Sequence, residues 1–165
     1  MVYWSELEYY ESAAHARNVC EPNTMRAVYT FFLVVKAHSK FLQLKEVFAT
    51  DENGYLLPPL RSAMSTIYPG WSAYRCHDQN NETECLTRFG DRDPSLEIEY
   101  SLDNGVGGIG IINSGTDVKK GTVAIYKNVG QQQLLWEDRF SGKKGDVLIW
   151  NGAFSFPLLL NEKKA

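Results

Sequence analysis

The residues best placed to do chemistry lie in the glycine-rich run DNGVGGIGIIN. Gly105, Gly107 and Gly110 have the G-x-G-x-x-G spacing with which dinucleotide-binding proteins hold a pyrophosphate. That chemistry needs a helix directly after the glycines, because the helix N-terminus supplies the amides that bind the phosphates. Here the glycines are followed by a β-branched run, a polar loop and a second strand-like segment. We therefore predict a turn between strands, in which Gly107, Gly108 and Gly110 let a neighbouring backbone or bulky side chain approach closely.

The other residue types used in catalysis do not form a known catalytic pattern. His15, His38 and His77 are far apart in the sequence and none lies in H-E-x-x-H, and there is no C-x-x-C pair, G-x-S-x-G elbow or P-loop. Asp91 and Asp93 lie in the turn-like GDRDP, where aspartates bond their own backbone. We expect a protein that is not an enzyme. A glycosidase whose two carboxylates come from distant strands is the alternative left open.

Composition and charge favour one soluble domain. The 165 residues are 44% hydrophobic and 13% aromatic, and the formal net charge is −3, which gives no general attraction to nucleic acid. The first residues carry acids where a signal peptide has its cationic and apolar regions. The most apolar run, residues 27–35, is about half the length of a transmembrane helix. We expect no signal peptide, no transmembrane segment and no nucleic-acid partner.

The three cysteines are an odd number. Cys76 and Cys85 bracket HDQNNETE and could close a small loop. Because we see no export signal in the sequence, we expect free thiols, with a Cys76–Cys85 bond as the alternative.

Strand-like segments dominate after residue 23. Leu96, Ile98 and Tyr100 alternate with acidic residues, and Leu42, Leu44 and Val47 suggest an inward face broken by one irregularity. Further short segments follow at intervals of about 12 residues, separated by Gly, Asn and Asp turns, as in antiparallel sandwiches. They are GIGII, GTVAIYKN, QLLWEDRF and DVLIWNG.

The first 23 residues have a different pattern. Ser5 and Glu8 form a capping box, and the short helix it predicts is stopped by Glu21 and Pro22. We predict a mainly β protein: a helical N-terminal arm over residues 1–23, an antiparallel β-sandwich over 24–158 and a C-terminal tail over 159–165.

An ordered series of motifs resembles the discoidin domains, also called coagulation-factor type C domains, of the galactose-binding-like superfamily. The matching stretches are Asp78 to Asn81, Cys85-Leu86-Thr87, DPSLEIEY (93–100) and IIN (111–113), together with the strand-like runs 26–35 and 41–54. The resemblance covers roughly residues 24–155 and implies a jelly-roll-like β-sandwich. Fold alone does not imply function, since this scaffold carries lectins, lipid-binding modules and structural parts.

The sugar-binding positions of the resemblance are altered in this chain. The family's ligand-binding His and Arg are replaced by Leu86 and Ser114, and the residues that align loosely with its ligand loop are Asp117, Lys119 and Lys120. We therefore do not expect glycan binding. A calcium site formed by Asp78, Asn80 and Asn81 is the one cofactor that the resemblance leaves open.

The resemblance also suggests a role. Similar domains occur in large double-stranded DNA viruses, whose capsids are built from β-sandwiches. We expect a non-enzymatic minor capsid component of the virion, assembled in the host cytoplasm, that cements capsomers by binding other capsid proteins. The alternative is a carbohydrate- or phospholipid-binding adhesion module. The arm is expected to bind a partner through its large apolar side chains. These are Tyr3, Trp4, Leu7, Tyr9 and Tyr10.

Overall fold

The computed structural model describes residues 30–101, 105–114, 118–129 and 131–152. Within these ranges the chain forms strands and one short 3-10 helix. In chain order they are β1 (Thr30–Ala37), β2 (Gln43–Thr50), β3 (Pro59–Met64), η1 (Ala73–Cys76), β4 (Cys85–Leu86), β5 (Ser95–Ser101), β6 (Gly108–Asn113), β7 (Val118–Val129), β8 (Gln131–Gly142) and β9 (Val147–Asn151).

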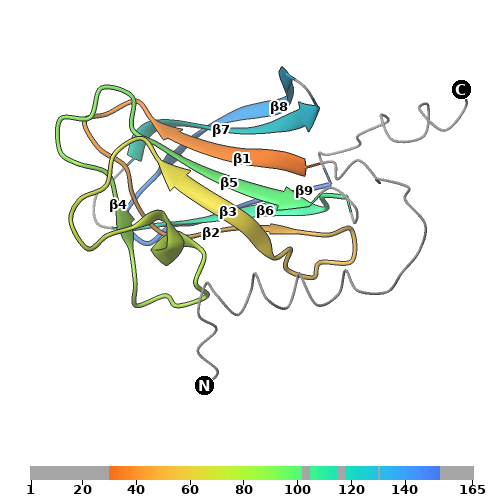
Figure 1. The fold of residues 1–165 in the computed structure, drawn as a ribbon. Helices are drawn as coiled ribbons and strands as arrows, with labels where there is room; N and C mark the ends of the chain where they lie inside the picture. Colours follow the sequence, from red (N-terminus) through yellow and green to blue (C-terminus); the bar gives the residue numbers. More distant parts are fainter. Residues whose placement is uncertain (1–29, 102–104, 115–117, 130, 153–165) are drawn as a thin grey trace, which may run out of the picture.

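The strands form two antiparallel sheets, which lie one over the other in Figure 1. The five-stranded sheet has the order β3-β5-β1-β7-β8, and the four-stranded sheet has the order β4-β2-β6-β9. The predicted mainly β, sandwich-like class is therefore confirmed. No helix in the described ranges is long and apolar enough to cross a membrane. The predicted N-terminal helix and C-terminal tail lie outside the described residues.

The core lies between the sheets and follows the alternation predicted from the sequence. Leu96, Ile98 and Tyr100 of β5 are buried, and Phe31 of β1 stacks on Tyr100 with ring centroids 5.2 Å apart. Burial of such side chains is the main favourable term in folding, about 1.5–3 kcal/mol each. The facing residues of β2 and β6 complete the core.

The predicted inward face of β2 is also confirmed, including its irregularity. Leu42, Leu44 and Val47 are fully buried, although Leu44 and Val47 are three residues apart. The pairing of β2 with β6 shifts register between Leu44 and Glu46. This irregularity lets both side chains point into the core, because without it residues three apart lie on opposite faces of a strand.

Gly105 and Gly107 lie in the connection from β5 of one sheet to β6 of the other, as predicted for a turn between strands, whereas Gly108 and Gly110 lie within β6 itself. A Cβ atom on Gly107 would lie 2.1 Å from the carbonyl oxygen of Asp51, and one on Gly110 would lie 2.0 Å from the Phe48 ring. The close approach of a backbone and of a bulky side chain is confirmed.

The expectation of free thiols is wrong for two of the three cysteines. Cys76 and Cys85 form a disulfide that joins the end of η1 to β4, with Cα atoms 5.3 Å apart. The expectation rested on an argument about the redox compartment, which says nothing of how the chain between the cysteines folds. Cys20 lies outside the described residues.

Candidate functional site

The two positions at which the discoidin resemblance places sugar ligands are buried. Leu86 of β4 is 5% exposed and Ser114, directly after β6, is 1% exposed. The Ser114 hydroxyl donates to the carboxylate of Glu84, and its amide donates to Asn113 Oδ1. Neither side chain is placed to meet a sugar in solvent.

The loosely aligned ligand residues lie elsewhere. Asp117 is outside the described residues, and Lys119 lies in β7. Lys120 is exposed, and its carbonyl accepts the His38 amide at 2.8 Å, next to the end of β1. The structure therefore places Lys120 on the five-stranded sheet, whereas Leu86 belongs to the four-stranded one.

The expected calcium-binding residues lie on the loop that the disulfide closes. The Asp78 carboxylate accepts the Thr83 hydroxyl at 2.7 Å and the Asn80 amide at 3.0 Å, while Asn80 Oδ1 accepts the Glu82 amide. Asn81 is exposed. Among the described residues no three His, Cys, Asp or Glu side chains form a group suited to a metal ion. Calcium binding by this loop stays a prediction.

The structure adds a carboxyl group that the sequence did not single out. Glu46 of β2 is 5% exposed and its Oε1 accepts the Asn80 amide at 3.0 Å. Burial raises the pKa of Glu46 to about 7, helped by the hydrogen bond with Asp78. Glu46 and Asp78 are 32 positions apart, so their proximity depends on the tertiary fold. The pair links β2 to the disulfide loop.

A serine and a histidine meet at the other side of this loop. His77 Nε2 lies 2.7 Å from Ser62 Oγ, which joins β3 to the residue after η1. Burial lowers the pKa of His77, and its Nδ1 is buried with no hydrogen-bond partner among the described groups. The contact links two segments that are 15 positions apart in the sequence.

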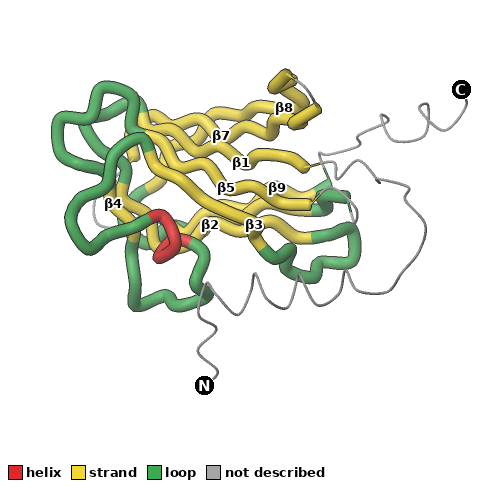
Figure 2. Tube along the Cα trace, viewed as in Figure 1, coloured by secondary structure: helices red, strands yellow, loops and turns green. Residues whose placement is uncertain are grey.

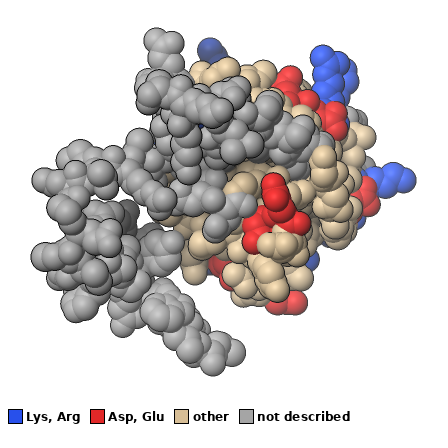
Figure 3. Space-filling model, turned by 90° about the vertical axis from the view of Figure 1, so that its right-hand side faces the viewer, with Lys and Arg blue, Asp and Glu red and all other residues tan. Residues whose placement is uncertain are grey.

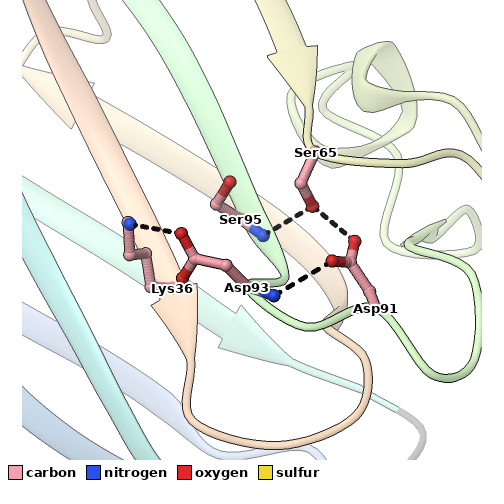
Figure 4. A network of polar contacts seen from close by, with 5 residues as sticks. All are labelled: Lys36, Ser65, Asp91, Asp93 and Ser95. Carbon is pink, nitrogen blue, oxygen red and sulfur yellow. Dashed lines mark hydrogen bonds and ion pairs between the residues drawn. The ribbon is translucent and has the colours of Figure 1, made fainter.

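The aspartates of the GDRDP turn act as expected for turn residues. Asp91 Oδ1 accepts the Asp93 amide at 3.1 Å, and its other oxygen accepts the Ser65 hydroxyl at 2.6 Å (Figure 4). The same oxygen accepts the Thr66 hydroxyl, also at 2.6 Å. These hydroxyls lower the pKa of Asp91. Asp93 is ion-paired with Lys36 of β1 at 2.9 Å. The network fixes the loop to β1 through Lys36 and to β5 through Ser95.

Exposed aromatic side chains gather where three loops meet. The Phe89 ring lies 5.0 Å from Phe41 and 5.6 Å from Tyr68, both in edge-to-face contact. Phe89 is 63% exposed, and Ile67 beside Tyr68 in the chain is also exposed. Figure 2 shows long loops at the end of the sandwich that carries β4 and η1. We call these four residues the loop aromatic cluster.

A second apolar surface lies at the opposite edge of the four-stranded sheet. Strand β9 pairs only with β6 among the described strands, so its outer edge has no partner strand there. Val147 and Ile149 each are 57% exposed, and they pair with Ile112 and with Gly110, over which the Phe48 ring lies. We call Phe48, Ile112, Val147 and Ile149 the β9 apolar face.

The other side of β9 is anchored to the core. Trp150 packs edge-to-face on Phe140 and Trp136, and its Nε1 donates to Asp138 Oδ2 at 2.8 Å. The sequence VLIW is apolar throughout, which is typical of a strand buried on both sides. Among the described residues only one side of β9 is covered, so the excess of apolar residues was the sequence signal for a binding surface.

Charge on the described surface is mixed. On the face shown in Figure 3, acidic and basic side chains stand among uncharged ones, and neither sign covers the described part of that face. A phosphate backbone is bound by many cations together. The described part of this face therefore offers no such track.

Comparisons of the chain with protein-family models, with curated proteins and with solved structures return no match. The discoidin resemblance thus rests on the motifs alone.

Proposed function

We propose that the protein is a non-enzymatic structural protein that works by binding other proteins. The observation that carries the proposal is the β9 apolar face, which adjoins a strand edge without a partner strand among the described residues. An uncovered edge strand with apolar side chains is a template for pairing with another chain. Exposed apolar patches of this kind mark protein interfaces on soluble proteins.

The assembly that we propose is a viral capsid. The motif resemblance to discoidin domains of large DNA viruses suggests a jelly-roll-like minor capsid component that cements capsomers. Burial of Leu86 and Ser114 supports this role over sugar binding, because the scaffold is kept while the ligand positions are closed. On this proposal the protein reaches the virion after assembly in the host cytoplasm, through contacts with other capsid proteins.

The test is to purify virions from cells that make the protein and strip any membrane with detergent. We expect the protein to remain with the protein shell. Its release with the detergent-soluble fraction, or its absence from purified particles, would contradict the capsid role.

A phospholipid-binding module is the second candidate, and the loop aromatic cluster favours it. Phe89 and Ile67 are exposed at loop positions, and the exposed Arg88 donates from Nε to the Ile67 carbonyl at 3.1 Å. Apolar side chains beside a cation suit the interface of an anionic membrane.

Co-sedimentation with phosphatidylserine vesicles tests this candidate. Binding that falls at least about fivefold in Phe89→Ala, with no change in Tyr55→Ala, would favour the membrane role. Tyr55 is a suitable control because it is 73% exposed and lies outside the cluster. Absence of vesicle binding in the unaltered protein would remove this candidate and leave the β9 proposal intact.

A further inference from the structure

The outer face of the five-stranded sheet is hollowed into a groove that the proposed function does not use. It has a volume of about 780 Å³ and is lined by β1, β7 and β8. The register places Val34 of β1 beside Ala124 of β7, and Lys36 beside Thr122. Across β7, Thr122 pairs with Arg139 and Ala124 with Glu137. Small side chains in the middle strand and long ones beside them therefore create the hollow.

The groove is positively charged on a protein whose net charge is negative. Its lining includes Lys36, Lys120 and Arg139, with His38 nearby, against the single carboxylate of Glu137. Lys36 is ion-paired with Asp93, whereas Lys120 and Arg139 form no ion pair with the described residues. Two cations thus stay available to an acidic ligand.

The floor of the groove limits the chemistry of that ligand. Val34, Ala124 and Tyr126 form an apolar and aromatic surface between the charged side chains. A nucleic-acid strand does not match this arrangement, since the phosphate-binding cations would be few and Glu137 would repel it. A ligand that matches the groove has carboxylates that alternate with large apolar groups, as in a peptide of acidic and aromatic residues. A volume of this size accepts several side chains.

The chain itself contains such a peptide. Residues 1–23 hold Glu6, Glu8 and Glu11, interleaved with aromatic residues that include Tyr9 and Tyr10. The segment 153–165 does not match, because its one acid, Glu162, is followed by two lysines. Charge complementarity therefore selects the N-terminal segment over the C-terminal one.

We propose that the groove binds residues 1–23 of this chain, with the glutamates against Lys120 and Arg139, beside the ion-paired Lys36, and the aromatic side chains on the floor. If the segment comes from a neighbouring copy, this contact would connect two copies of the protein, in addition to its contacts with other proteins. The proposal rests on the groove and stands independently of the β9 apolar face.

A carbodiimide, which joins a carboxylate directly to a neighbouring amine, tests the contact on the full-length protein. Mass spectrometry is expected to find Glu6, Glu8 or Glu11 linked to Lys120 or Lys36. These links should exceed those to Lys45 and Lys143 by about fivefold, the effect of an exposed ion pair worth up to about 1 kcal/mol. Lys45 and Lys143 are fair references because neither lines the groove.

Charge reversal separates a real contact from general attraction. Arg139→Glu is expected to lower the links to Lys120 and Lys36 about fivefold, while Arg92→Glu, the same change at an exposed loop site, leaves them within about twofold. Circular dichroism melting checks that both variants fold. A mixture of isotope-labelled and unlabelled protein shows whether the segment comes from the same or a neighbouring copy, and either arrangement supports the proposal. The proposal would be overturned if the cross-links from the N-terminal glutamates were spread evenly over all lysines. It would also be overturned if the cross-links to Lys120 and Lys36 were unchanged in Arg139→Glu.

Discussion

The two edges of the four-stranded sheet, β4 and β9, are treated in opposite ways. The β4 edge is covered: Leu86 donates its amide to the Trp71 carbonyl and its carbonyl accepts the Tyr68 amide. The disulfide from Cys85 to Cys76 fastens η1 over the same edge. No described segment covers β9, and its outward side chains are apolar. Because proteins protect edge strands that have no partner, the contrast supports the proposal that another protein covers β9.

The edges of the five-stranded sheet support this interpretation. Strand β3 carries Pro59 and Arg61 and shifts register between them, and β8 presents exposed charged residues such as Glu137 and Arg139. Proline, charge and irregular pairing all discourage further strand addition. Val147 and Ile149 have none of these protections.

The largest effect is expected from removing the disulfide that fastens η1 over the β4 edge. Replacing Cys76 and Cys85 by serine should lower the free energy of unfolding by about 2–3 kcal/mol, because a short disulfide loop no longer restricts the unfolded chain. Urea unfolding of the variant and of the oxidised protein measures the difference. Equal stabilities, with the bond verified in the unaltered protein, would mean that the loop is held by its other contacts alone.

The next effect concerns binding at the open edge. Ile149→Lys should weaken incorporation into the shell by roughly 30-fold, the loss of about 2 kcal/mol typical of an interface centre. Ile67→Lys is the matched control, since Ile67 is 45% exposed in the loop aromatic cluster and Ile149 is 57% exposed on β9. Occupancy per particle, measured by quantitative mass spectrometry, compares the two. A larger loss of occupancy in Ile67→Lys than in Ile149→Lys would contradict an interface at β9 and would place it at the loop aromatic cluster.

A smaller effect concerns pH at the protected edge. The folded pKa of Glu46, about 7, lies above its ordinary value of 4.5, so ionisation opposes folding and stability is lost as pH rises through 7. Glu46→Gln removes this loss. The free energy of unfolding of Glu46→Gln, relative to that of the unaltered protein, should increase by about 1–3 kcal/mol as the pH rises from 4.5 to 8. A constant difference across this range would show that Glu46 ionises as an ordinary glutamate.

The smallest effect is expected at the serine–histidine contact. Ser62→Ala should reduce stability by about 1 kcal/mol, since it removes one hydrogen bond to a partly buried imidazole. Ser72→Ala, at an exposed site whose side chain does not cap η1, is the control. Thermal unfolding at pH 8, where His77 is neutral, measures both. A null result for Ser62→Ala would mean that water replaces the hydroxyl.

The contrast between the edges also explains what the sequence could predict. Alternation in β5, the irregularity in β2 and the crowded Gly110 were foreseen, because each follows from local spacing and from the need to bury one face. Strand β4 has two residues and no periodicity to read. Its place is set by distant segments such as β2, with which it pairs across 41 to 43 positions (Leu44 with Cys85 and Gln43 with Leu86).

The same limit applies to the candidate sites. Glu46 with Asp78, and Ser62 with His77, are brought together by tertiary folding, and neither pair has a sequence motif. The groove depends on which residues of β1, β7 and β8 share a face, and so on strand order. Among the cations that line the groove, the sequence motifs indicate only Lys120, and they indicate a sugar as its ligand.

The most direct test of the account is hydrogen exchange at β9, measured in the free protein and in purified shells. If another protein covers this edge, the amides of residues 147–151 that do not face β6 should exchange quickly in the free protein. In the shell they should exchange at least about tenfold more slowly, while the amides around β4 keep their rates. Equal exchange at β9 in both states would contradict the claim that this strand is the protein's binding edge.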